Sequence, residues 1–190
     1  MLFSRTTTPF KDSNKEKAAQ LLITSTALTD LGLSDARVVV GAMMLRRVQN
    51  GTVLIKEGEA TNTDFMMLIL EGEVLVDNEL TSMEDSMVMS IISSGSLIGE
   101  MGVLDGAPRS ATCTATTDLA VAVLSRDALL TLIKGNPAVS ARLMLAISKR
   151  LSDRLREANR KIRTLGGLSR ALQQELDAAH HTGGGGLTGA

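Results

Sequence analysis

Residues 99–112 read GEMGVLDGAPRSAT. Gly99 and Gly102 flank Glu100 and Met101, and glycine lets the backbone approach a ligand closely because it carries no side chain. A short helical turn that begins here would direct unpaired N–H groups outward, and such groups favour an anion. The stretch therefore indicates a loop that can bind an anion.

Arg109 follows Glu100 within the same stretch, comes directly after Pro108 and leads into a predicted strand. A guanidinium presents a rigid fork of donors that matches phosphate oxygens. An ionised glutamate only accepts hydrogen bonds, so it can hold a sugar hydroxyl. An anion cradle, an arginine and an acceptor together describe a site for a ribose phosphate. The alternative is a surface loop in which the glutamate and the arginine are incidental.

The spacing of these residues resembles the phosphate-binding cassette of the cyclic nucleotide-binding domain family. That family includes catabolite activators, regulatory subunits of cyclic AMP-dependent kinase and cyclic nucleotide-gated channels. Its pattern is Gly-Glu, an apolar and a small residue, then Pro-Arg-small-Ala-Ser/Thr after a fixed gap, as in residues 99–102 and 108–112. Residues 51–59, 65–74 and 125–137 also resemble the family, so the likeness covers about residues 28–165.

The resemblance implies an α+β fold that is mainly β, an antiparallel β-roll of the jelly-roll type (a double-stranded β-helix) with N-terminal helices and a long C-terminal helix. We expect four parts along the chain: an N-terminal helical extension over 1–27, the cyclic nucleotide-binding β-roll over 28–135, the long helix over 136–179 and a flexible tail over 180–190.

The resemblance also implies a role for each cassette residue. Glu100 would hold the ribose 2′-hydroxyl and Arg109 the cyclic phosphate, and the amides of Met101, Gly102 and Ser110 would complete the cradle. The Ser110 hydroxyl could touch the phosphate or a guanine amine, so it leaves cyclic AMP and cyclic GMP both open. Arg154 on the long helix could contact the base, or could be a solvated charge. The predicted ligand-binding residues are Gly99, Glu100, Met101, Gly102, Arg109, Ser110, Ala111 and Arg154.

Composition excludes several classes of protein. Lys and Arg number 20 against 21 Asp and Glu, a net charge of -1, which disfavours nucleic-acid binding through global charge. His180 and His181 lie together in the tail, so the core offers no imidazole for a catalytic triad or a metal. We therefore expect no enzyme, no metal and no cofactor besides the nucleotide ligand.

Short apolar runs predict no membrane segment, and the absence of a signal peptide predicts a cytoplasmic protein.

Periodicity predicts the elements. Helical spacing indicates helices over 13–31 and over 35–44, the second capped by Ser34. Strands are expected over 53–55, 65–70, 74–76, 87–92, 111–117 and 119–124. A short helix over 127–134 precedes a long helix that begins at Pro137 and runs to about Leu165, where Gly166 and Gly167 would break or kink it before helix resumes over 168–179.

An apolar stripe on the long helix predicts a homodimer. Its residues recur by 4, 4, 3, 4 and 3 positions: Ile147, Leu151, Leu155, Ala158, Ile162 and Leu165. The part from about Leu155 on would project beyond the roll and pair with a second chain. The alternative is a helix that folds back after Gly166 and Gly167, so that Leu168, Leu172 and Leu176 cover the stripe.

The resulting expectation is a cyclic nucleotide sensor that signals to an unknown effector through movement of the C-terminal helix. One alternative is a catabolite-activator-like regulator that acts on DNA through a partner or through its basic helix. A second is an interaction module that has lost ligand binding, which the intact Glu100 and Arg109 disfavour. Since no winged helix-turn-helix follows the long helix, we expect no direct DNA binding.

Overall fold

The computed structural model describes residues 12–24, 27–28, 30–77 and 90–183. The chain divides into two compact units, Met1–Ile147 and Ser148–Ala190. The predicted boundaries at 27/28 and 135/136 do not coincide with this division. The two N-terminal helices contact each other, and the first of them contacts the sheet. Both lie in the first unit, and the division falls within the long helix.

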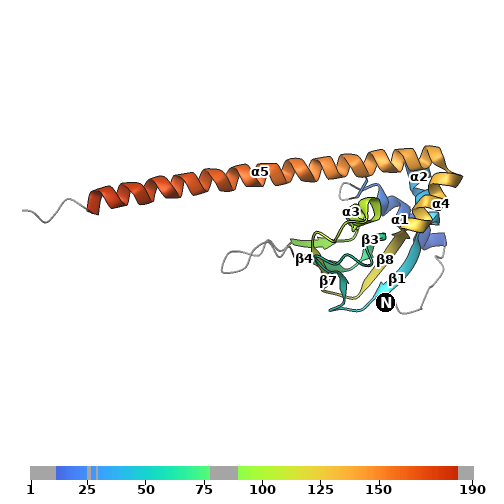
Figure 1. Ribbon diagram of the computed structural model, residues 1–190. Helices are drawn as coiled ribbons and strands as arrows, with labels where there is room; N and C mark the ends of the chain where they lie inside the picture. The colour runs from blue at the N-terminus through green and yellow to red at the C-terminus, as the bar shows by residue number, and fades with distance from the viewer. Residues whose placement is uncertain (1–11, 25–26, 29, 78–89, 184–190) are drawn as a thin grey trace, which may run out of the picture. The chain divides into compact units, whose positions relative to one another are not determined.

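The first unit is built on two four-stranded antiparallel sheets (Figure 1). One sheet has the order β1 (Met44–Val48), β8 (Leu119–Ser125), β3 (Phe65–Glu71) and β6 (Leu97–Ile98). The other has the order β2 (Val53–Ile55), β7 (Thr112–Ala115), β4 (Glu73–Asp77) and β5 (Ser90–Ser93). The predicted antiparallel β-roll is confirmed.

The core lies between the two sheets, and the central strand β3 is buried on both faces. Phe65, Met67 and Ile69 belong to the cluster between the sheets. The intervening Met66 and Leu68 are equally buried and point to the opposite face of the sheet. Helix α1 (Asp12–Leu22) contacts β3. Cover on both faces explains why β3 is a continuous apolar run rather than an alternating one.

The N-terminal helices are shorter than predicted. Helix α1 ends at Leu22, because Thr24 donates to the carbonyl of Leu21 through both its hydroxyl (2.8 Å) and its amide (3.2 Å) and so turns the chain. Helix α2 (Leu33–Gly41) has Gly32 as its N-cap with no side-chain cap, so the prediction of a Ser34 cap is wrong. The helix predicted over 35–44 also included Met44, the first residue of β1. The hydrophobic periodicity of the sequence did not predict this strand.

Three further helices follow: α3 (Glu100–Asp105), α4 (Arg126–Gly135) and α5 (Pro137–Gly183). Ser125 caps α4, since its hydroxyl accepts from the amide of Ala128 at 3.2 Å. Helix α5 begins at Pro137 as predicted but continues through Gly166 and Gly167 to Gly183. The predicted break is wrong, because each glycine costs only about 1 kcal/mol relative to alanine and a long helix tolerates it.

Several predicted segments lie partly outside the described residues. Residues 1–11 and 25–26 of the predicted N-terminal extension and residues 25–26 and 29 of the predicted helix over 13–31 are not described. The predicted strand over 87–92 is observed as β5 over Ser90–Ser93, and residues 87–89 are not described. The predicted tail over 180–190 begins as helix, because α5 extends to Gly183, and residues 184–190 are not described. The continuous helix also replaces the alternative in which the chain folds back after the two glycines.

An ion pair between α2 and the start of α5 gives a prediction for stability. Arg142 Nη2 donates to Asp35 Oδ1 at 2.8 Å, and this hydrogen bond lowers the pKa of Asp35 below its ordinary value. A carboxylate with a lowered pKa in the folded state stabilises the fold above its unfolded pKa, and this contribution is lost as the pH falls through the folded pKa. We expect Asp35→Asn to unfold at lower urea than the wild type at pH 7, and the difference to shrink from about pH 5 downward. A difference that stays constant between pH 7 and pH 3 would contradict this assignment.

Candidate functional site

The predicted anion loop is formed by the end of β6, Gly99 and the short helix α3. Gly99 has φ 77°, the left-handed conformation that glycine adopts without strain, and it turns the chain from β6 into the helix. The first bond of the helix is donated by the amide of Val103 to the carbonyl of Gly99 at 3.4 Å. The amides of Met101 and Gly102 precede it, so they have no acceptor within the helix.

Arg109 is the centre of this site. Its side chain is buried, with 5% of its surface exposed. Nη1 donates to the carbonyl of Gly99 at 3.1 Å, and Nη2 donates to the carbonyls of Asn62 at 2.7 Å and Phe65 at 3.1 Å. The guanidinium therefore joins the cassette to the loop between β2 and β3.

Two further contacts fix the position of Arg109. Its guanidinium carbon lies 4.5 Å from the centre of the Phe65 ring, a cation–π distance. Its backbone amide donates to the carbonyl of Glu59 at 3.0 Å, and its own carbonyl accepts from the amide of Gly58 at 2.9 Å. Main chain and side chain are thus both held by the segment 58–65.

The two glycines of the cassette are required by Arg109. A Cβ on Gly102 would lie 2.7 Å from Arg109 Nη1 and 2.8 Å from the carbonyl of Thr63, and a Cβ on Gly99 would lie 3.0 Å from the same Nη1. We expected these glycines to admit a ligand. The group that packs closely against them in the structure is the guanidinium.

Among the residues that the structure describes, no carboxylate forms a direct ion pair with the guanidinium of Arg109. Burial lowers the pKa of Arg109, while the more distant Asp64, Glu59 and Glu100 act in the opposite direction. An arginine stays protonated in proteins, so the site holds a buried positive charge.

The guanidinium also keeps donors for a ligand. The guanidinium has five N–H groups. The single N–H of Nε and one of the two on Nη1 have no acceptor among the described residues. A buried cation with spare donors is stabilised by an anion that accepts those hydrogen bonds. The arrangement can therefore bind a phosphate.

The structure brings seven of the eight predicted ligand-binding residues together. Glu100 is buried, with 1% of its surface exposed. The hydroxyl of Ser110 lies 3.8 Å from the sulfur of Met101, and both of these side chains are exposed. Gly99, Gly102 and Ala111 complete the group. Arg154 lies on α5 in the second unit with an exposed side chain, and its contact with a base stays a prediction.

Sequence reasoning missed the loop between β2 and β3. Glu59, Asn62 and the carbonyl of Phe65 contact Arg109, although they lie more than forty positions before it in the chain. The available signal was a polar run between Gly58 and Phe65, with the residues EATNTD. Such a run predicts a loop but does not indicate which side chain it will contact.

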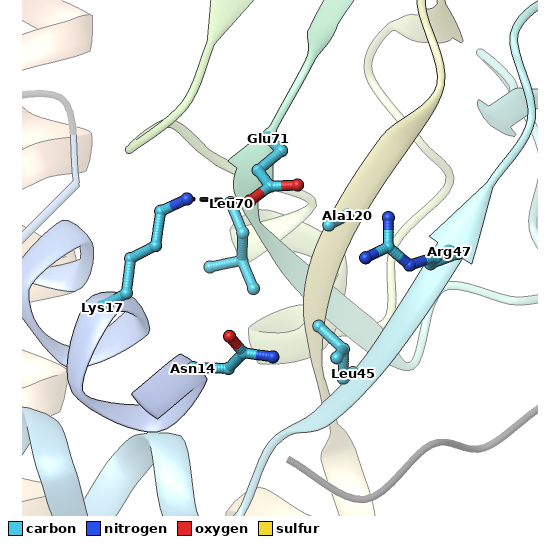
Figure 2. A pocket seen from close by; sticks show the side chains of 7 residues that line it. All are labelled: Asn14, Lys17, Leu45, Arg47, Leu70, Glu71 and Ala120. Atoms are coloured by element: carbon cyan, nitrogen blue, oxygen red, sulfur yellow. Dashed lines mark hydrogen bonds and ion pairs between the residues drawn. The ribbon is translucent and has the colours of Figure 1, made fainter. Parts of the chain in front are cut away.

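A small pocket lies elsewhere, on the outer face of the sheet that contains β1, β3 and β8. Its volume is about 50 Å³, and no cassette residue lines it. Figure 2 shows the side chains around it, which are Asn14, Lys17, Leu45, Arg47, Leu70, Glu71 and Ala120. It is too small for a nucleotide, because ligand pockets typically measure about 300–1,000 Å³.

Within the described part of the chain, no group of histidine, cysteine, aspartate and glutamate is arranged to hold a metal ion.

Comparison with known proteins identifies the first unit. The sequence model of the cyclic nucleotide-binding domain family matches residues 45–136, the range that contains all eight strands except the first residue of β1, together with α3 and α4. Residues 45–136, just under half of the chain, match this family. The cassette around Glu100 and Arg109 lies inside the matched range, so the resemblance noted in the sequence is confirmed.

Curated relatives and a solved structure agree with this assignment. A cAMP-dependent protein kinase regulatory subunit of Yarrowia lipolytica is 37% identical over 100 residues, which are 53% of this chain and 25% of that protein. A CRP-like cAMP-activated global transcriptional regulator of Mycobacterium tuberculosis is 26% identical over 53% of this chain and 44% of its own length. A cyclic nucleotide-binding domain from Methylobacillus flagellatus has a TM-score of 0.66 and 29% identity, and covers 77% of this chain and 80% of its own.

The chain spans a quarter of one of these curated relatives and less than half of the other. The match is therefore to a part of each relative and not to the whole protein. No helix among the described residues is long and apolar enough to cross a membrane.

Proposed function

We propose that this domain binds a cyclic mononucleotide through its phosphate and acts as a regulatory, non-catalytic sensor. The observation that carries the proposal is the buried guanidinium of Arg109, which has spare donors and no direct ion pair among the described residues. A bound phosphate would supply both the missing negative charge and the missing acceptors. The match of residues 45–136 to the cyclic nucleotide-binding domain family supports a cyclic nucleotide as the source of that phosphate.

The other cassette residues take the remaining parts of the ligand. The amides of Met101 and Gly102, at the start of α3, would donate to phosphate oxygens together with the amide of Ser110. Glu100, which follows the left-handed turn at Gly99, would accept from the ribose 2′-hydroxyl. Ala111 would line the cradle beside Ser110.

Cyclic AMP is the first ligand to test, because both curated relatives are named for it. Ser110 is compatible with either purine, so cyclic GMP is the second. We expect a saturating cyclic nucleotide to raise the melting temperature, since a ligand at 100 times its dissociation constant stabilises the folded state by about 2.7 kcal/mol. Thermal-shift measurements with cyclic AMP, cyclic GMP and cyclic di-GMP test this, with 5′-AMP as the non-cyclic control. Equal shifts with 5′-AMP and with cyclic AMP would contradict recognition of the cyclic phosphate.

A route for the signal is supported by the contacts of Arg126, the first residue of α4. Its amide donates to the carbonyl of Asp64 at 2.7 Å, and its Nη2 lies 3.5 Å from the carbonyl of Leu104 in α3. A Cβ on Gly106 would lie 3.0 Å from Arg126 Nη1, so the end of α3 packs closely against this side chain. A ligand that shifts α3 would therefore shift α4 and the start of α5, and change the population of their positions.

We further propose that α5 pairs with α5 of a second copy. The described part of the second unit, residues 148–183, is a single helix, so this part has no core of its own in which to bury apolar side chains. Six of its large apolar residues are 55–65% exposed: Leu155, Ile162, Leu165, Leu168, Leu172 and Leu176. Leu155, Ile162 and Leu176 lie at multiples of seven positions, and Ala158, Leu165 and Leu172 form a second series three positions after the first. These two series are the pattern of a coiled-coil seam. A second copy presents the same seam and can cover it.

A further inference from the structure

We propose that Glu59 is a positioning residue for Arg109, which acts by holding the Asn62 carbonyl on the guanidinium. The proposal rests on the proposed function, because its consequence is a change in cyclic nucleotide affinity. Glu59 lies outside the cassette, in the loop that joins β2 to β3.

The carboxylate of Glu59 organises this loop. Its Oε1 accepts from the hydroxyl of Thr61 at 3.1 Å and from Asn62 Nδ2 at 3.0 Å. The hydrogen bond from Asn62 is the main cause that lowers the pKa of Glu59, so the carboxylate is ionised at neutral pH. A single side chain thus holds two residues of the turn.

Asn62 has an unusual backbone conformation that needs such support. Its φ is 54°, the single positive value among the described residues other than glycine. This conformation is unfavourable for residues with a side chain, and asparagine is among those that tolerate it best. It directs the Asn62 carbonyl to Arg109 Nη2, at 2.7 Å the shortest hydrogen bond of that guanidinium.

Glu59 also holds the main chain of Arg109 directly. Its carbonyl accepts from the amide of Arg109 at 3.0 Å. The arginine is therefore held at its backbone by Glu59 itself and at its guanidinium through Asn62. Because the Glu59 carboxylate contacts Thr61 and Asn62 rather than Arg109, its effect on a ligand is transmitted through the position of the arginine.

The test compares variants that differ in the acceptor. Glu59→Ala removes it, and we expect cyclic AMP to bind about 5- to 30-fold more weakly in calorimetric titration, the loss typical of one hydrogen bond in a coupled network. Glu59→Gln keeps an acceptor oxygen, and we expect its affinity to stay within about threefold of the wild type. Glu73→Ala, which removes an exposed carboxylate from β4, is the matched control and should bind like the wild type.

A second variant and a ligand-free readout keep the proposal testable if Glu59→Ala folds poorly. Asn62→Gly tolerates the positive φ but removes the donor to Glu59, and should weaken binding in the same way. In nitrogen-15 spectra of the nucleotide-free protein, the Arg109 side-chain N–H signals should exchange with water faster in Glu59→Ala and Asn62→Gly than in the wild type and Glu59→Gln. This readout does not need a ligand, so it separates the positioning role from a failure of the wild type to bind any cyclic nucleotide.

Coupling to Arg109 distinguishes a positioning role from a general loss of loop structure. In an Arg109→Lys background, which lacks the fork that Asn62 holds, Glu59→Ala should cost less affinity than in the wild type. Unchanged Arg109 signals in Glu59→Ala, additive effects in this cycle, or a Glu59→Gln variant as impaired as Glu59→Ala would each overturn the proposal.

Discussion

Replacement of Arg109 by leucine is expected to weaken cyclic nucleotide binding by about 10- to 150-fold, which corresponds to the roughly 1.5–3 kcal/mol of a hydrogen bond to a charged group. The substitution removes the positive charge at the centre of the cassette together with the donors that would face the phosphate. It also removes the hydrogen bonds that Arg109 donates to the carbonyls of Asn62, Phe65 and Gly99. The melting temperature should therefore fall as well.

Two companion variants separate these effects in calorimetric titrations. Arg109→Lys keeps the charge but not the planar fork, so its affinity should lie between that of the wild type and that of the leucine variant. Arg37→Leu removes an exposed arginine that pairs with Glu16 at 2.8 Å, and it should bind as the wild type does. If folded Arg109→Leu binds within threefold of the wild type, Arg109 does not hold the phosphate.

The second large effect concerns assembly. We expect the wild type to be a dimer at tens of micromolar, and Leu155→Glu combined with Ile162→Glu to be a monomer. Each glutamate would place a charge in the apolar seam of the paired helices, where burial without a partner is unfavourable. Both residues lie in the second unit, so the melting of the β-roll should change little. Light scattering measures the mass directly.

A control tests whether the position of the new charges matters. Thr164→Glu and Gln174→Glu add two carboxylates to the same helix, two positions from the stripe residues Ile162 and Leu172, so they do not face the seam. This variant should remain a dimer. A wild type of monomer mass at tens of micromolar would rule out the pairing of the helices.

The sequence predicted the cassette because its chemistry is local. Glu100 and Arg109 lie close in the chain, and the glycines and Pro108 between and beside them restrict the backbone. The sheets were predicted for a similar reason, since β3 and β8 are long apolar runs that end at polar turns. The start of α4 likewise depends on a contact between near neighbours, because the hydroxyl of Ser125 caps the amide of Ala128 three positions later.

What the sequence did not predict depends on contacts between distant residues. The role of the segment 58–65 requires Arg109 to fold against it, and nothing in the segment itself indicates that contact. The reason for glycine at position 102 is likewise the guanidinium packed against it rather than a ligand. Helix α1 ends early because of a hydroxyl at Thr24, and the apolar spacing that continues to residue 31 obscures that end.

Calorimetric titration of the wild-type chain with cyclic AMP and cyclic GMP tests the central claim most directly. We expect saturable binding of one cyclic mononucleotide per chain, with heat that is lost or strongly reduced in Arg109→Leu. If neither nucleotide gives heat or a thermal shift at millimolar concentration, the assignment of the cassette as a cyclic nucleotide site is contradicted.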